Sequence, residues 1–273
     1  YKDVTFYINT LLPVGPALAG RIMGKRVVYH YHENAFVKGT FYKVLATIMQ
    51  KLAHEIICVS EYQASFLQQK KCVITVPNAL PQNFVNRLTP NFQAAFKRKH
   101  ILMLGSLKLY KSPLEFIELA KRLPQFIFVL VINDIKENID IFIKEYKINI
   151  SKNLTIYPQQ NDVVPFYNQT SLVLNLSNKK QFVETFGLTA LEAMSAGLPV
   201  IVPTEGGIAE MVVDGGNGYK IDVQNLNQIA ECIKTILSDE TLYMKLAQNA
   251  LAYSKRFSEA KMVNCIEMIL NRK

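Results

Sequence analysis

Short apolar runs alternate with helical stretches from one end of this 273-residue chain to the other. The apolar runs have the length of strands, and we expect strands at 4–8, 26–30, 55–59, 73–76, 100–104, 126–133, 153–157, 171–176, 199–202 and 218–221. Helices are expected between them, near 15–23, 38–52, 61–69, 136–146, 163–168, 187–196, 225–237 and 240–255. One more helix should follow Ser112-Pro113, with Ser112 as its N-cap and Pro113 in its first turn. This alternation is typical of parallel sheets with crossover helices, so the sequence predicts an α/β fold.

Length and one polar stretch indicate two domains. The chain is longer than a typical single domain. Residues 81–99 are polar and contain prolines, and we interpret them as a solvated linker; its basic end, 97–99, is an alternative contact for anionic lipid or acceptor. We therefore expect a first domain at 1–86, a second at 87–256, and a final segment at 257–273. That segment has a helical period, with one apolar face formed by Met262, Cys265, Ile266 and Ile269.

The net charge of +9 lies in the first third of the chain. Residues 1–100 contain 13 Lys and Arg against 4 Asp and Glu, and the remainder contains 18 of each. A basic region indicates an anionic partner, either a membrane surface or a phosphorylated acceptor. No nucleic-acid recognition motif accompanies the basic residues, so nucleic acid is not an expected partner.

The cysteines and the hydropathy of the sequence indicate the cellular compartment of the protein. The four cysteines lack the spacing of metal ligands and are typical of reduced cytosolic thiols. The apolar runs are far shorter than the roughly 20 residues of a membrane span, and no signal peptide is visible. We expect a cytoplasmic protein, free or peripheral on the inner face of the cytoplasmic membrane.

Two carboxylates, Glu184 and Glu192, stand eight residues apart and flank a Phe186-Gly187 step that opens a helix. The free N–H groups and the dipole at a helix start favour phosphate, and Gly187 lets a backbone approach a ligand closely. Glu192, one turn into that helix, suits a ribose diol better than a phosphate. Glu184 can bind a sugar hydroxyl or support positive charge at an anomeric carbon. The alternative for either residue alone is an ordinary surface glutamate.

A second candidate segment follows the strand expected at 100–104. Gly105 and Ser106 form a turn, and Lys111 stands just before the next helix. A lysine at this place can neutralise a leaving diphosphate as it gains charge. The alternative is an exposed lysine that only flanks the helix.

The run Tyr29-His-Tyr-His-Glu33 ends a strand of the first domain, where α/β proteins place ligands. Alternation puts His30 and His32 on one face if the strand continues that far. Two His and a Glu can bind a metal, but no third ligand cluster is evident, so a metal site is not expected. A plain packed or exposed histidine pair remains an alternative to a role in a site.

These segments together resemble a known family. Glu184-x7-Glu192, the run 192–203, Gly206-Gly-Ile-Ala-Glu210 and Asn217-Gly218-Tyr219 are similar to the donor-site signature of family 4 retaining glycosyltransferases with the GT-B fold. The resemblance implies two Rossmann-like domains that face across a cleft, with the last helix crossing back to the N-terminal domain. It also implies that this chain begins partway through that domain, which would leave the N-terminal domain incomplete.

The resemblance further implies roles for single residues. Glu192 would bind the ribose, Glu184 would meet the donor sugar, and backbone N–H groups would hold the diphosphate; these would come from Phe186, Gly187, Leu188 and Thr189. His32 would lie near the transferred sugar and Glu33 toward the acceptor. Lys111 matches a family lysine, whereas Ser106 replaces a basic residue, so either Lys108 substitutes or amides hold more of the phosphate.

By this resemblance the protein is a retaining glycosyltransferase of bacterial surface-polysaccharide synthesis. The donor would be a UDP- or GDP-sugar and the acceptor a glycan or a lipid-pyrophosphate saccharide. No metal or other cofactor is expected, because cationic side chains and amides take a metal's place and no Asp-x-Asp triplet is present. The alternatives are a nucleotide-sugar epimerase or a glycoside phosphorylase of the same fold, and a non-catalytic nucleotide-sugar-binding subunit.

Overall fold

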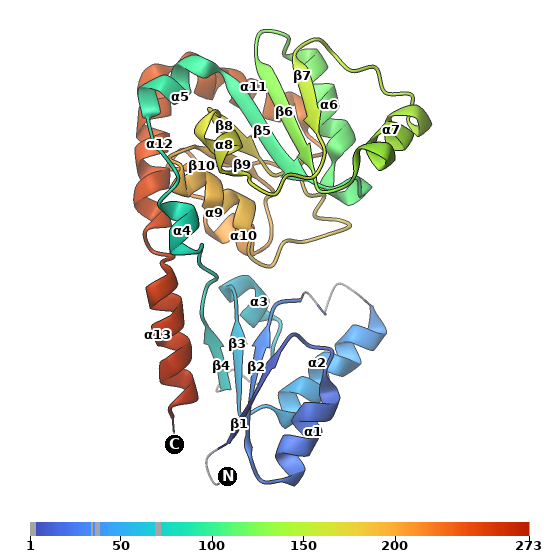
Figure 1. Ribbon diagram of the computed structural model, residues 1–273, viewed down its shortest axis with the longest axis vertical. Helices are drawn as coiled ribbons and strands as arrows, with labels where there is room; N and C mark the ends of the chain where they lie inside the picture. Colours follow the sequence, from blue (N-terminus) through green and yellow to red (C-terminus); the bar gives the residue numbers. More distant parts are fainter. Residues whose placement is uncertain (1–3, 34, 36–38, 69–71, 273) are drawn as a thin grey trace. The chain divides into compact units, whose positions relative to one another are not determined.

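The computed structural model describes residues 4–33, 35, 39–68 and 72–272. The chain forms two compact units: unit 1 comprises Tyr1–Ala79, Val183–Phe186 and Phe257–Lys273, and unit 2 comprises Leu80–Phe182 and Gly187–Arg256. Each unit contains one parallel sheet with helices packed on it (Figure 1). This confirms the predicted α/β fold with two parallel sheets. The first passage between the units is at Ala79–Leu80, whereas the sequence analysis places it at 86–87.

Unit 1 has a four-stranded sheet in the order β1-β2-β3-β4, and every pair is parallel. The strands are β1 (Thr5–Asn9), β2 (Arg26–Tyr31), β3 (Glu55–Cys58) and β4 (Val73–Thr75). The helices between them are α1 (Val14–Ile22), α2 (Thr40–Leu52) and α3 (Glu61–Ser65). Helix α3 is shorter than the expected 61–69, and two expected helical positions, Lys38 and Gln69, lie outside the described residues.

Alternating side chains of the unit 1 sheet cover its two faces. Val27, Tyr29 and Tyr31 pack with buried residues of α1 and α2 in one cluster. Val28 and Ile57 point to the opposite face, where they contact α13 (Glu259–Leu270). The helix presents the apolar side chains expected from its sequence, namely Met262, Cys265, Ile266 and Ile269. Alternate residues of the strands therefore pack against one face of the helix in a single core.

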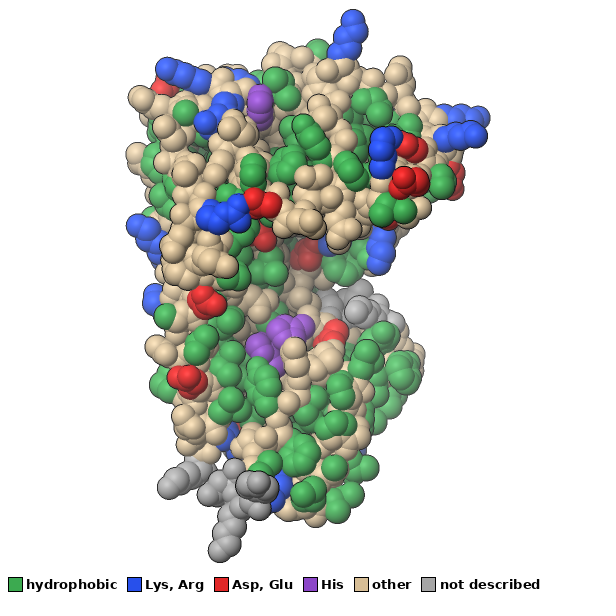
Figure 2. Space-filling view, in the orientation of Figure 1, with side chains coloured by type: hydrophobic (Ala, Val, Ile, Leu, Met, Phe, Trp, Pro, Cys, Tyr) green, Lys and Arg blue, Asp and Glu red, His purple; other side chains and the backbone are tan. Residues whose placement is uncertain are grey.

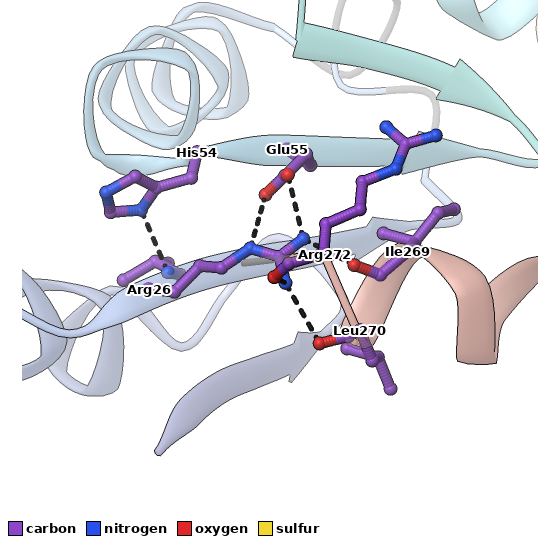
Figure 3. Close-up of polar contacts among 7 residues, drawn as sticks. Arg26, His54, Glu55, Ile269, Leu270 and Arg272 are labelled. Atoms are coloured by element: carbon purple, nitrogen blue, oxygen red, sulfur yellow. Dashed lines mark hydrogen bonds and ion pairs between the residues drawn. The ribbon is translucent and has the colours of Figure 1, made fainter. Parts of the chain in front are cut away.

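Arg26, the first residue of β2, joins this sheet to the end of α13 (Figure 3). Its Nε and Nη2 donate to the two carboxylate oxygens of Glu55 at 3.1 and 2.8 Å. Its Nη1 donates to the carbonyls of Leu270 and Arg272 at 2.9 and 2.8 Å, and Nη2 also donates to the carbonyl of Ile269. The last carbonyls of a helix lack intrahelical donors, so the guanidinium caps α13 at its carboxyl end.

Unit 2 has a six-stranded parallel sheet in the order β10-β9-β8-β5-β6-β7. Its strands are β5 (His100–Gly105), β6 (Ile127–Ile132), β7 (Leu154–Tyr157), β8 (Leu172–Leu174), β9 (Val200–Val202) and β10 (Gly218–Lys220). From β5 the chain builds outward through β6 and β7, and then returns to the other side of β5 to form β8. The strand order therefore reverses between β5 and β8, which is a topological switch point.

Six helices of unit 2 match the expected ones within a few residues, and a seventh, α10 (Gly207–Glu210), was not expected. The six are α6 (Pro113–Arg122), α7 (Lys136–Glu145), α8 (Val164–Asn168), α9 (Leu188–Ser195), α11 (Leu226–Ser238) and α12 (Glu240–Ser254). Asn225 and Asp239 cap α11 and α12 through their side-chain oxygens. The ten expected strands are all present, with ends shifted by a residue or two.

The interpretation of residues 81–99 as a solvated linker is wrong. They contain α4 (Gln82–Val85) and α5 (Phe92–Arg98), and α5 packs against α12 (Figure 1). Asn91 caps α5, since its Oδ1 accepts from the N–H of Ala94 at 3.0 Å. Lys99 follows the helix as its C-cap and has a left-handed backbone conformation, with φ 57°. Its ammonium lies 3.2 Å from the centroid of the Phe96 ring and donates a hydrogen bond to the carbonyl of Leu237. The run 97–99 is thus the end of a packed helix.

Candidate active site

The residues expected to bind a donor within unit 2 lie at the topological switch point. Gly105 ends β5, and the segment that follows the neighbouring strand β8 leads to Gly187 and α9. Contacts join the two segments: the N–H of Asn178 donates to the carbonyl of Tyr110 at 2.8 Å, and the rings of Tyr110 and Phe182 stack at 4.9 Å between centroids. In open α/β sheets, this crevice at the carboxyl ends of the strands is where ligands bind.

Gly187 can only be glycine in this structure. Its φ of 95° lies in the left-handed region, and a Cβ built there would stand 2.5 Å from Cγ1 of Ile208. Gly187 is the N-cap of α9 and has no side chain to accept from the first N–H groups. The N-terminus of α9 therefore keeps the positive character that attracts an anion.

Gly105 differs from Gly187, because neither its conformation nor its packing demands glycine. The nearest atom to a Cβ built on Gly105 is Cε of Met103, at 3.9 Å. The missing side chain thus serves no contact within the protein, which agrees with a ligand approaching the backbone there. Ser106 follows in the turn and is partly exposed.

Lys111 ends a short 3₁₀ helix, Leu109–Lys111, beside this turn. Its Nζ lies 4.1 Å from the centroid of the Phe182 ring, a cation–π distance. Lys108 lies with its Nζ 5.7 Å from the centroid of the Tyr110 ring. The two lysines thus lie against the stacked rings of Tyr110 and Phe182 at the switch point. Two cations at this place suit a diphosphate.

Ser112 occupies the N-cap position of α6, as expected, but its side chain does not cap the helix. It has a left-handed conformation with φ 58°, and its side chain makes no capping hydrogen bond. Its hydroxyl is buried without a partner among the described residues. Pro113 does occupy the first turn, as expected.

Glu192 lies one turn into α9, and Tyr167 of α8 fixes its side chain. The hydroxyl of the fully buried Tyr167 donates to Oε2 of Glu192. Among the described residues no donor reaches the other oxygen, Oε1. Burial raises the pKa of the Glu192 carboxyl, and the hydrogen bond from Tyr167 opposes that rise. A fixed carboxylate with one available oxygen can accept from a sugar hydroxyl.

The other signature residues of this segment differ in their surroundings. Thr189 accepts a 3.4 Å hydrogen bond from Nδ2 of Asn175, and Leu188 is 45% exposed. Phe186 is buried and packs edge-on against Phe257, with ring centroids 5.8 Å apart. Glu184 is half-buried and belongs with Phe186 to unit 1, while Gly187 and all that follows to Arg256 belong to unit 2. The signature is therefore divided between the units at Phe186–Gly187.

In unit 1, the histidines form a buried array at the end of β2. Tyr7 and His30 share a 2.5 Å hydrogen bond between the hydroxyl and Nδ1, and the rings of His30 and His32 lie 4.1 Å apart. Burial, and the neighbouring His32, lower the pKa of His30 to about 4. Burial also lowers the pKa of His32, opposed by Glu33. Both rings are therefore neutral near pH 7.

Glu33 already has hydrogen-bond partners in the protein. Its Oε2 accepts from the N–H of Leu11 at 3.1 Å, and its backbone carbonyl accepts from Nε2 of Gln63 at 2.9 Å. The carboxylate thus holds the start of the segment that leads into α1. No three His, Cys, Asp or Glu side chains within the described ranges are grouped so that they could hold a metal ion.

Sequence reasoning missed two residues of these arrays, Tyr167 and Tyr7. Both contacts join residues more than 20 positions apart, so no local pattern predicts them. For Tyr167 the one available signal is general, since a fully buried tyrosine needs a hydrogen-bond partner. Tyr7 is 39% exposed and gives no such signal. No helix in the described part of the chain has the length and apolarity to cross a bilayer.

Comparisons with known proteins agree with this architecture. HepE of Anabaena, solved in complex with UDP and glucose, aligns with a TM-score of 0.81 and 19% identity, covering 98% of this chain and 78% of that one. TarM aligns with a TM-score of 0.78 and 16% identity, covering 98% of this chain and 55% of the other. At these identities the likeness shows the GT-B fold and no more.

Sequence relatives carry names from one class. An uncharacterized glycosyltransferase of Methanocaldococcus jannaschii is 39% identical over 80 residues, which are 29% of this chain and 23% of the relative. The N-acetyl-alpha-D-glucosaminyl L-malate synthase of Bacillus anthracis is 30% identical over 142 residues, 52% of this chain and 36% of the relative. The chain thus spans about a quarter to a third of the length of these two relatives.

The family described as Glycosyl transferases group 1 matches residues 87–253, from α5 to the end of α12. The match includes the switch point, Gly187 and Glu192. The chain belongs to the glycosyl transferases group 1 family.

Proposed function

We propose that this protein transfers a sugar, with retention of its anomeric configuration, from a nucleoside diphosphate to a glycan or lipid-linked saccharide. Its family and the names of its relatives support a glycosyltransferase. UDP is the favoured nucleotide, because the HepE structures hold UDP and UDP-glucose. The proposed setting is bacterial surface-polysaccharide synthesis in the cytoplasm, at the inner face of the membrane.

We base the proposal on one arrangement at the switch point of unit 2: a positively polarised helix start and a lysine would suit a diphosphate, and a carboxylate would suit a ribose. The amino end of α9 at Gly187 supplies partial positive charge, and the ammonium of Lys111, which lies on the Phe182 ring, supplies a full positive charge. The tyrosine-held carboxylate of Glu192 supplies a hydroxyl acceptor one turn further along α9. A nucleoside diphosphate contains both groups in this order.

The same groups favour departure of the nucleotide. As the bond from the anomeric carbon to the diphosphate breaks, negative charge grows on the phosphate oxygens. Amide dipoles at Gly187, Leu188 and Thr189 and the cation of Lys111 stabilise that charge more in the transition state than in the ground state. We therefore propose that transfer needs no metal ion, and that excess EDTA leaves the rate unchanged.

We propose that His32 and Glu184 of unit 1 take part in transfer. A neutral His32 can accept or donate a hydrogen bond to a sugar hydroxyl, and its lowered pKa keeps it neutral at pH 7. Glu184 can support positive charge at the anomeric carbon. Glu33 is assigned to the acceptor side. Replacing His32 or Glu184 with Ala should lower turnover more than donor affinity.

A thermal-shift panel tests the donor site. UDP-, GDP-, ADP- and dTDP-sugars are compared, since a ligand that binds only the folded state raises the melting temperature. We expect one nucleotide class to stand out in the wild type, and Lys111→Met and Glu192→Ala to reduce its shift. A lysine outside the site, Lys121→Met, serves as the control. No shift with any donor would refute the proposal.

Product analysis tests the reaction. With a saccharide acceptor, a transferase releases nucleoside diphosphate only when the acceptor is present, and NMR of the product gives the anomeric configuration. A new nucleotide sugar formed without acceptor would indicate an epimerase instead. Donor binding with neither product would indicate a binding subunit.

A further inference from the structure

We propose that the outer surface of α1 and α2 docks this protein on an anionic lipid bilayer. This surface, called the α1–α2 face, consists of Leu12, Leu18, Ile22, Met23, Phe41 and Val44 with the lysines Lys43 and Lys51. The inference concerns unit 1 alone and does not depend on the reaction proposed for the donor site.

The apolar side chains of this face are large and exposed. Ile22 is 77% exposed, Phe41 67% and Met23 60%, and Leu12, Leu18 and Val44 are each at least half exposed. Helices α1 and α2 pack side by side, and Figure 2 shows hydrophobic side chains gathered over this part of unit 1. A contiguous apolar surface of this kind on a water-soluble unit marks a place for a partner.

The opposite sides of the two helices are already used by the core. Helix α1 buries Ala17 and Gly20, and helix α2 buries Leu45, Ala46 and Met49. A surface helix normally keeps charged and polar residues on its outer side. Here the outer sides also present large apolar side chains, beside lysines, and the core of unit 1 does not use them.

The charges on these helices have one sign. Neither α1 nor α2 contains Asp or Glu, and the only acidic residue between Val4 and His54 is Glu33, whose carboxylate accepts from Leu11. Lys43 and Lys51 are exposed on α2, and Arg21 lies near the end of α1. Exposed apolar side chains on helices that carry cations and no acidic residue match the interior and the anionic headgroups of a bilayer.

Helix α7 of unit 2 provides a contrast. It also exposes an isoleucine, Ile141, at 61%. However, its ten residues include three acidic side chains against two lysines, so its charges give it no attraction to an anionic surface. Exposed apolar residues occur on both units. Of the three helices compared, α1 and α2 combine them with cations and contain no acidic residue, whereas α7 contains three.

Charge also argues against a second copy of this chain as the occupant. A symmetric dimer would bring two copies of the same basic face together, and like charges facing each other oppose association. A protein segment that covers the face would need an acidic, apolar sequence. A bilayer with anionic lipids is both negatively charged at its surface and apolar inside, so it matches the cations and the apolar side chains of the face.

Vesicle flotation tests the proposal. Wild-type protein should float with phosphatidylcholine–phosphatidylglycerol vesicles and stay at the bottom with phosphatidylcholine alone. The charge variant Lys43→Glu/Lys51→Glu and the apolar variant Ile22→Ser/Phe41→Ser should each lower binding by about tenfold or more. The matched control, Ile141→Ser/Lys121→Glu on unit 2, should bind as the wild type does. Thermal shift with nucleotide in every variant shows that the fold and the donor site are intact.

Two results would overturn the proposal. The first is equal flotation of the wild type and both face variants, which would place any lipid contact elsewhere. The second is a wild-type dimer in light scattering that the apolar variant converts to a monomer, without flotation of either. In that case a second copy, and not a bilayer, covers the α1–α2 face. Failure of nucleotide binding would count against the donor site and leave this inference untouched.

Discussion

In the role proposed for it, Glu192 accepts hydrogen bonds from hydroxyls most strongly when it is charged and held in one position. Burial opposes the charge and raises the pKa of the carboxyl, while the Tyr167 hydroxyl stabilises the charged form and fixes its Oε2. Tyr167 is itself fixed, because it is fully buried and packs edge-on against Phe84. We therefore regard Tyr167 as a positioning residue for Glu192.

Replacing Tyr167 with Phe tests this arrangement. Loss of a hydrogen bond to a charged group should weaken nucleotide binding by about tenfold. Because Glu192 is assigned to the ribose, the variant should also lose preference for a ribonucleotide over its 2′,3′-dideoxy analogue. Calorimetry with both nucleotides provides the measurement, and Tyr146→Phe on α7 is the control. Equal loss of affinity for both nucleotides would indicate a general packing defect.

Gly187→Ala should damage both stability and ligand binding. The added methyl group meets Ile208, and the left-handed φ strains any other residue, so we expect a loss of about 2 to 4 kcal/mol. Urea unfolding measures this loss. Gly15→Ala on α1, where a Cβ meets nothing within 4 Å, should leave stability unchanged or slightly higher. Similar losses in both variants would contradict the assigned cause.

The buried His30 gives the protein a definite acid sensitivity. Its pKa is about 4 in the folded protein and about 6.5 when unperturbed, so between these values the unfolded chain binds a proton that the folded chain does not. The free energy of unfolding should therefore fall as the pH drops from 6.5 to 4, by roughly 2 kcal/mol from this residue. In His30→Asn that part of the fall should be missing when unfolding curves are compared at both pH values. Parallel curves for the two proteins would remove His30 as its source.

At the scale of helices and strands, α13 shows how one side chain, that of Arg26, can stabilise the end of a helix. Its apolar side chains pack on Val28, Ile57 and Val76, but packing alone leaves the carbonyls at its carboxyl end without donors. Arg26 supplies those donors and is itself oriented by Glu55. The side chains of this ion pair are 17% and 16% exposed, so removing one partner would leave the other as a poorly solvated, unpaired charge.

Arg26→Met should therefore destabilise unit 1 by about 3 kcal/mol, because Glu55 and three carbonyls lose their donor. Hydrogen exchange should quicken first in α13. Arg122→Met removes an exposed ion pair with Glu118 and should cost less than about 0.5 kcal/mol. Undiminished protection of α13 in Arg26→Met would mean that packing alone holds the helix.

The elements that the sequence predicts are those with a clear apolar period. All ten strands were expected, because each is a short apolar run with polar or turn residues on both sides. Helices α4 and α5 were not expected, because prolines and polar residues dominate 81–99. Asn91 was a usable signal, since it caps α5, but a seven-residue helix with one buried residue has too little apolar period to be predicted.

The places of the candidate donor residues in the fold were predictable where they depend on the local order of strand, turn and helix. Gly187 and Glu192 follow from the signature and lie as expected at the start of α9. What holds them does not follow, because Ile208 and Tyr167 reach the site through the fold of unit 2. The tyrosine behind His30 was hidden for the same reason, since it lies on the neighbouring strand β1.

Across the whole molecule, the chain passes between its units at four points, Ala79–Leu80, Phe182–Val183, Phe186–Gly187 and Arg256–Phe257. Each unit nevertheless has its own sheet. Calorimetry should accordingly resolve two unfolding transitions. Nucleoside diphosphate at about 100 times its Kd should raise the unit 2 transition by roughly 5 to 10 °C and leave the other nearly unchanged. Hydrogen exchange assigns each transition, and an equal shift of both would mean that the ligand stabilises the two units together.

The position of α13 also sets an order of events during synthesis. This helix covers one face of the sheet formed by the first 79 residues, yet the ribosome makes it only after all of unit 2. Val28, Ile57 and Val76 therefore have no cover while unit 2 is being translated and folds. Unit 1 is therefore completed only after unit 2 has been made, and we expect the uncovered apolar face of its sheet to be open to chaperones until then.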